Sequence, residues 1–100
     1  MKELKKTIEG RGDTKGFVYN QIDKNDFGYI YSASVDGEII GYEVFKRKIY
    51  KKSPPYVMED SVGYPNSEAF GVWAWYFIEY ETAKNMLKTI EKEHFSSKKR

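Results

Sequence analysis

Residues 29–45, YIYSASVDGEIIGYEVF, decide the fold of this 100-residue chain. Asp36 and Gly37 in the middle are the strongest short hairpin signal in the sequence, because glycine tolerates the positive φ that a type I′ turn requires. On both sides of this pair, the side chains alternate between two faces with the period of a β-strand. The stretch therefore predicts a hairpin of two strands, residues 29–35 and 38–49.

The hairpin extends outward into a larger antiparallel sheet. Residues 17–22 alternate in the same way, and the polar turn at 23–26 joins them to the hairpin, which makes a three-stranded meander. Residues 7–9 are interpreted as a short first strand. Residues 72–78 are the most hydrophobic run, with Trp73 and Trp75 expected on one face. They predict a further strand that is either covered on both faces or central in the sheet with one aromatic face partly open.

The last element is expected to be a helix, because apolar residues recur at the spacing of one buried stripe: Ala83, Met86, Leu87 and Ile90. His94 and Phe95 are expected to end this helix. The fold class is therefore α+β: an antiparallel four- to five-stranded meander-type sheet with one C-terminal helix packed on one face. We expect a single domain over residues 1–95 and a disordered basic tail over residues 96–100.

The composition excludes several kinds of chemistry. The chain has no cysteine and one histidine, so disulfides, thiolate metal sites and cysteine nucleophiles are absent. A catalytic triad or a transition-metal site would have to use His94 near a helix end, which offers no fixed geometry. No apolar run approaches the ~20 residues of a membrane span, and the first six residues lack the apolar segment of a signal peptide. We expect a cytoplasmic protein that is not an enzyme and uses no cofactor and no metal.

Charge is distributed unevenly along the chain. Residues 46–52 carry five positive charges and no acid, whereas residues 53–83 carry five negative charges and no base, so the sign switches at Ser53. Such a field can steer a charged partner. The alternative is that the two stretches face each other or are simply solvated.

Residues 51–70 break all periodicity around Pro54 and Pro55, and a loop of this length is usually functional or mobile. Residues 57–58 are interpreted as a short edge strand within it. Aromatic residues in and beside this loop are the anchors that protein interfaces favour, although the two tryptophans fit a core equally well. The candidate partner-binding residues are Lys46, Arg47, Lys48, Lys51, Lys52, Tyr56, Tyr64, Phe70, Trp73 and Trp75.

These observations favour a non-enzymatic binding domain whose partner is another protein, either a host factor or a second copy of this chain. The alternative is a domain that binds single-stranded nucleic acid. In that case sheet aromatics would stack on bases beside the basic segment 46–52, and the rings available are Tyr29, Tyr31, Tyr42 and Phe45. Against this alternative, the same rings alternate as core residues do, and the RNP-type signature of RNA-binding sheets is absent.

Three segments carry a resemblance to known sequences: TIEGRG at 7–12, YEVFKRK at 42–48 and FGVWAW at 70–75, with Ala83 opening the final helix. Together they resemble small uncharacterised proteins of bacteriophages and mobile elements of gut bacteria. The resemblance implies a phage or plasmid context and transfers no activity and no site residues. Accessory proteins of that setting often bind a host protein, so the resemblance favours an interaction module.

Overall fold

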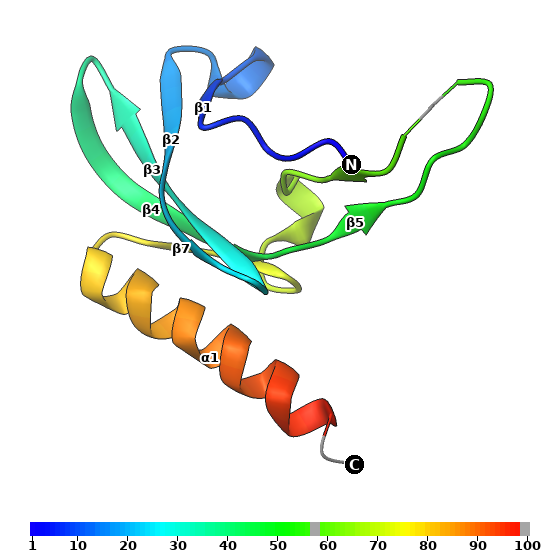
Figure 1. Cartoon of the computed structure of the whole chain (residues 1–100). Coiled ribbons are helices and arrows are strands. Elements are labelled where there is room, and N and C mark those ends of the chain that lie inside the picture. The colour runs from blue at the N-terminus through cyan, green and yellow to red at the C-terminus, as the bar shows by residue number, and fades with distance from the viewer. Residues whose placement is uncertain (57–58, 99–100) are drawn as a thin grey trace.

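The sheet of this protein has one helix on one side and two irregular segments on the other (Figure 1). The computed structural model describes the backbone of residues 1–56 and 59–98 and the side chains of residues 1–56 and 59–93. The elements are β1 (Thr7–Glu9), η1 (Gly12–Thr14), β2 (Phe17–Asn25), β3 (Gly28–Val35), β4 (Glu38–Lys46), β5 (Ile49–Tyr50), β6 (Ser61–Val62), η2 (Ser67–Ala69), β7 (Ala74–Phe77) and α1 (Tyr80–Lys98).

Five strands form the main sheet in the order β1-β2-β3-β4-β7, and every neighbouring pair is antiparallel. The first four strands follow one another as a meander, and β7 adds to the far edge of β4 after the long connection. The predicted fold class, a four- to five-stranded antiparallel sheet with one C-terminal helix, is confirmed.

The hairpin that decides the fold forms as its sequence predicts. Asp36 and Gly37 both adopt a positive φ, at 52° and 82°, as a type I′ turn requires. The register pairs Val35 with Glu38 next to the turn, then shifts between Ala33 and Ser34, which marks a bulge. A bulge increases the local twist of the strands, so the sheet curves near this turn.

The helix covers the face of the sheet that carries Ile30 and Val44, which are both fully buried. Ala83, Leu87 and Ile90 pack against them, so the predicted apolar stripe is the buried one. The helix continues to Lys98, beyond the predicted end at residue 95, because no glycine or proline interrupts it. Residues 96–98 are therefore helical and not part of a tail, and residues 99–100 lie outside the described part of the chain.

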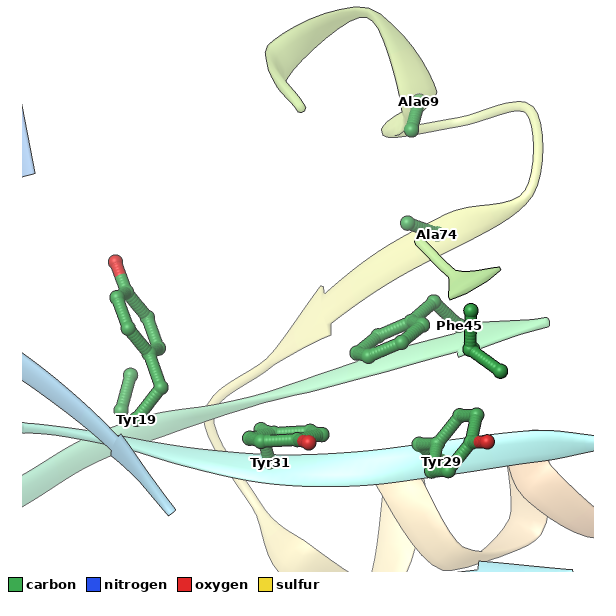
Figure 2. Close-up of a cluster of buried hydrophobic side chains, with 8 residues drawn as sticks. Tyr19, Tyr29, Tyr31, Phe45, Ala69 and Ala74 are labelled. Carbon is green, nitrogen blue, oxygen red and sulfur yellow. The ribbon is translucent and has the colours of Figure 1, made fainter. Parts of the chain in front are cut away.

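The opposite face of the sheet carries a cluster of aromatic rings (Figure 2). Tyr29, Tyr31 and Phe45 are buried side by side, with Phe45 stacked on Tyr31 at 5.6 Å between ring centroids. Each such pair stabilises the core by about 0.5–1.5 kcal/mol beyond the area it buries. Val62 and Ala69, from the connection before β7, cover these rings. The sheet is thus packed on both faces.

The strand predicted at residues 72–78 begins later, at Ala74. A turn precedes it, in which Gly71 has φ 88° and the Val72 N–H donates to the Ala69 carbonyl. Trp73 therefore lies outside the alternation of the strand and packs beside Phe45, whereas Trp75 packs on the helix side. The prediction that both tryptophans share one face is wrong, because alternation holds only within an extended strand.

The predicted loop 51–70 is partly ordered by pairing. β5 and β6 form a two-stranded ribbon, and Lys2 joins it through the Val62 N–H, which donates to the Lys2 carbonyl at 2.9 Å. Further along, the Asn66 side chain accepts a hydrogen bond from the Glu68 N–H and caps the single turn η2. The short strand predicted at residues 57–58 lies outside the described residues.

Candidate functional site

A cleft of about 930 Å³ opens on the aromatic side of the sheet. One wall is β1 with the segments around it, and the other wall is the chain from Tyr64 to Phe70. Its volume is at the upper end of the range typical of ligand sites, roughly 300–1,000 Å³. The residues that line it are Lys5, Thr7, Ile8, Glu9, Gly10, Arg11, Thr14, Tyr19, Glu43, Tyr64, Pro65, Asn66, Ser67 and Phe70.

The floor of the cleft comes from the sheet itself, through Tyr19 of β2 and Glu43 of β4. Glu43 lies two residues before Phe45, so the alternation of β4 directs both side chains to the same covered face. Figure 2 shows the Tyr19 ring standing on this face with its hydroxyl directed away from the sheet. An acid is thus held on the same side of the sheet as the aromatic core.

Tyr64 joins the wall of the cleft to its floor. Its ring packs edge-on against Phe45 and Tyr31, at 5.0 and 5.2 Å between centroids, and lies 5.9 Å from Tyr19. Three ring contacts fix the direction of the side chain. Its hydroxyl donates a hydrogen bond to Oε1 of Glu43.

Burial dominates the electrostatics of this pair. It raises the pKa of the Glu43 carboxyl above its usual range, and the hydrogen bond from Tyr64 opposes part of that rise. Burial and the nearby Glu43 carboxylate together raise the pKa of Tyr64 far above the ordinary value of a phenol. Tyr64 is therefore a hydrogen-bond donor at any physiological pH, and Glu43 carries the charge of the site when it is ionised.

Glu43 has no ion-pair partner among residues 1–56 and 59–93. The salt bridges of that part of the chain lie elsewhere and join Arg47 to Glu3, Lys51 to Asp60, and Lys46 to Glu93. Glu9, Lys5 and Arg11 also line the cleft, but all three are exposed to solvent. The carboxylate on the floor is thus the charged group of the cleft that is least hydrated.

Strand β1 gives the cleft an open edge of backbone. The Gln21 N–H donates to the Lys6 carbonyl and the Gly10 N–H donates to the Phe17 carbonyl, at 2.7 and 2.9 Å. In an antiparallel pair the direction of the peptide groups alternates, so those of Thr7 and Glu9 point away from β2. In the described part of the chain β1 ends the sheet, and no strand pairs with this outer side.

Two of the predicted partner-binding residues, Tyr64 and Phe70, line the cleft. Tyr56 is 91 % exposed and is not part of it. Trp73 packs at the edge of the aromatic cluster, where Lys48 Nζ lies 5.1 Å from its ring centroid. Trp75 belongs to the helix side, so the structure does not bring the ten predicted residues together in one surface.

The basic segment 46–52 is partly balanced by acids of the same chain. Arg47 pairs with Glu3 at 3.0 Å and Lys51 with Asp60 at 3.6 Å, and the backbone N–H of Lys52 donates to Asp60. Lys46 lies 4.0 Å from Glu93. The alternative considered from sequence, that the basic and acidic stretches face each other, holds for the pair of Lys51 and Asp60. The acids that pair with Lys46 and Arg47 lie outside residues 53–83.

Of the four aromatic residues proposed as a base-stacking platform, three are buried and Tyr42 is partly buried. Tyr29, Tyr31 and Phe45 are buried under the segments that cover the sheet, and Tyr42 packs with the helix-side cluster. These rings therefore do not form an open base-stacking platform, and binding of single-stranded nucleic acid stays a prediction. The physical reason is that both faces of this sheet are needed to build a core.

Glu43 belongs to the predicted strand 38–49 and is not among the candidate partner-binding residues. One signal was present: alternation places Glu43 on the face of Phe45, and an acid on a buried face is unusual. The partner Tyr64 lies 21 residues later, in a segment without periodicity, and no local pattern connects the two.

Among the residues that the structure describes, no three or more His, Cys, Asp or Glu side chains form a group that could hold a metal ion. No helix in the same part of the chain is long and apolar enough to span a membrane.

No family model matches this chain, and neither the curated proteins nor the solved structures contain a significant match to it. The resemblance to phage and mobile-element proteins stays a prediction. Any proposal about function therefore depends on the geometry of the cleft.

Proposed function

We propose that this protein is a non-enzymatic binding domain that holds a segment of a partner protein in the cleft above Glu43. The observation that carries the proposal is the combination of an aromatic floor with an unpaired strand edge in one cleft. An extended peptide can hydrogen-bond to the outward peptide groups of Thr7 and Glu9 while one of its side chains enters the cleft beside Tyr19 and Tyr64.

The amino acids of the cleft suit protein recognition. Tyr19, Tyr64 and Phe70 are large side chains already held by packing, so little conformational entropy is lost when a ligand contacts them. Asn66 and Ser67 add polar groups on the same wall. A mixture of fixed rings and a few polar groups is typical of sites that select a ligand by shape and then orient it.

The chemistry supports binding more than catalysis. Glu43 is a single carboxyl at the floor, and its hydrogen-bond partner Tyr64 has a raised pKa, so this tyrosine does not act as a base. The other acid of the cleft, Glu9, is exposed at its rim. General acid–base catalysis needs a second group of matched pKa placed near the first, and the described lining residues supply no such pair.

A peptide-display selection tests the proposal with two matched variants. Ser67→Trp fills the cleft from the η2 wall, whereas Glu68→Trp places the same ring on the neighbouring exposed residue, which does not line the cleft. We expect the unmodified domain and Glu68→Trp to enrich the same family of sequences from a random library, and Ser67→Trp to lose them. Circular dichroism of each variant confirms that it is folded.

The opposite pattern would contradict the proposal. Enrichment that survives in Ser67→Trp places the binding surface outside the cleft, and a selection that converges on nothing with folded protein removes the peptide-binding function. Light scattering of the purified chain decides whether the partner is a second copy, because self-association would be lost in Ser67→Trp alone. Titration with a labelled oligonucleotide at low salt tests the nucleic-acid alternative, since phosphate contacts are strongest there.

A further inference from the structure

We propose that the side chain recognised in this cleft is cationic, a lysine ammonium or an arginine guanidinium that pairs with the Glu43 carboxylate. The inference rests on the proposed function, because it names the chemistry of the segment that enters the cleft. It follows from three features of the site, taken in turn below: an unpaired inner carboxylate, the rings around it and the position of the other charges.

The first feature is the carboxylate itself. Oε1 of Glu43 accepts a hydrogen bond from Tyr64, and no lysine or arginine among residues 1–56 and 59–93 lies within ion-pair distance of either oxygen. A carboxylate held away from bulk water interacts strongly with the first cation that reaches it, because the effective dielectric constant is low there. A carboxylate without a partner in a cleft is therefore complementary to a positive group.

The second feature is the set of aromatic rings that faces the same space. Tyr19 and Tyr64 stand 5.9 Å apart with their planes tilted by 53°, and Phe70 lines the cleft with them. The faces of such rings attract cations, and the hydrocarbon stem of lysine or arginine packs on them without loss. A neutral apolar side chain would use the rings but leave the carboxylate unpaired.

The third feature is the position of the other charges. Lys5, Arg11 and Glu9 line the cleft but are exposed, so water and salt screen them. The least screened charge is the negative one on the floor. An anionic side chain that entered the cleft would approach Glu43 directly, whereas acidic residues that flank the bound lysine or arginine would meet Lys5 and Arg11 at the rim.

The test is an NMR titration of the ¹⁵N-labelled chain with capped pentapeptides of sequence Val-Thr-Xaa-Thr-Val. Xaa is lysine, arginine, norleucine or glutamate, and n-butylammonium is titrated separately as the free amine. Each probe is measured with the unmodified chain, with Glu43→Gln, and with Glu38→Gln. Glu38 is an exposed acid at the start of β4 that does not line the cleft, and it serves as the matched control.

We expect the lysine and arginine peptides to bind the unmodified chain and Glu38→Gln at least about tenfold more tightly than the norleucine peptide. Resonances of residues 64–70 and of β1 should shift. In Glu43→Gln this preference should disappear while the norleucine peptide binds as before. Because glutamine keeps the shape and an acceptor for Tyr64, an unchanged spectrum of the free variant shows that its fold is intact.

Each other outcome overturns a definite part of the inference. Equal binding of the lysine and norleucine peptides leaves the cleft as a peptide site and removes the cationic preference. If n-butylammonium shifts the resonances and no peptide does, the site binds an ammonium group, but its ligand is a small amine and not a protein segment. No shift in the cleft with any probe removes the peptide-binding function and this inference with it.

Discussion

The hydrogen bond between Tyr64 and Glu43 makes a quantitative prediction. Tyr64→Phe deletes the hydroxyl that donates to Glu43 and leaves the ring contacts with Phe45 and Tyr31 in place. A hydrogen bond to a charged group contributes about 1.5–3 kcal/mol of net stability. We therefore expect the free energy of unfolding at pH 7 to fall by about 2 kcal/mol, which for a chain of this size lowers the melting temperature by roughly 10 °C.

A double-mutant cycle isolates this interaction from other effects of the phenylalanine. In a Glu43→Leu background the carboxylate is gone, so the same Tyr64→Phe change should cost almost nothing. The expected coupling energy is about 2 kcal/mol at pH 7 and about half of that below the pKa of Glu43, where the acceptor is neutral. Tyr76→Phe is the control, because this hydroxyl belongs to the residue directly opposite Glu43 on β7 but donates to the Ile40 carbonyl.

Urea unfolding followed by tryptophan fluorescence measures all four corners of the cycle, because Trp73 and Trp75 are both partly buried and report the loss of each face. If Tyr64→Phe costs the same in both backgrounds within about 0.5 kcal/mol, the two side chains are not coupled. The site described above would then lose its central interaction.

Three other changes test separate parts of the structure. Burial raises the pKa of Glu43 in the folded protein above its ordinary value of 4.5. The protonated carboxyl therefore contributes its full share of the free energy of unfolding below pH 4.5, and this contribution is lost as the pH rises through the folded-state pKa. Glu43→Gln should therefore raise the melting temperature at pH 7, and a melting curve recorded at pH 4 or below should show no such gain. Phe45→Ala removes a fully buried ring from the aromatic cluster and should cost about 3–5 kcal/mol in urea unfolding, whereas a cost under 1 kcal/mol would show that the cluster is not the core. Lys51→Ala breaks a solvent-accessible ion pair with Asp60 and should leave the free energy of unfolding almost unchanged, and a clear loss of stability would mean that the ribbon depends on this charge.

The parts of the fold that could be predicted from the sequence are those decided by neighbouring residues. The turn at Asp36 and Gly37 follows from backbone sterics alone, and the stripe that includes Ala83 and Leu87 follows from the helical period. Alternation in β3 also separates Tyr31 from Ile30 correctly between the two faces. In each case the residues that decide the conformation lie close together in the sequence, within one or two helical turns or a few residues of one strand.

One failure occurs at the start of β7, where a local turn interrupts an apolar run. Residues 72–73 continue the apolar pattern of the following strand, yet the turn at Gly71 and a hydrogen bond to Ala69 remove them from it. Periodicity does not detect this, because the residues are as apolar in a turn as in a strand. The assignment of Trp73 to the wrong face follows from the same cause.

The candidate site could not be predicted because a distant segment decides it. Whether the face that holds Glu43 is covered depends on the path of residues 60–70, and Lys2 anchors that path by pairing with β6. A contact between the two ends of a 60-residue interval leaves no local trace in the sequence. Only the position of Glu43 on the side of Phe45 was visible in advance, and its meaning depended on this contact.

The position of Glu43 in the domain favours function over stability as its explanation. A 100-residue chain has one small core, and an apolar side chain at this position would pack on the rings without the cost of burying an acid. Glu43 instead stands beside Phe45 with a tyrosine hydroxyl as its hydrogen-bond partner and an open cleft above it. Natural proteins place such locally unfavourable residues mainly at functional sites, where the lost stability is offset by binding. This argument predicts two results for Glu43→Gln, a gain in stability and a loss of the preference for a cation. A variant that gained stability but kept the preference would show that the cost of burying Glu43 is not linked to cation binding.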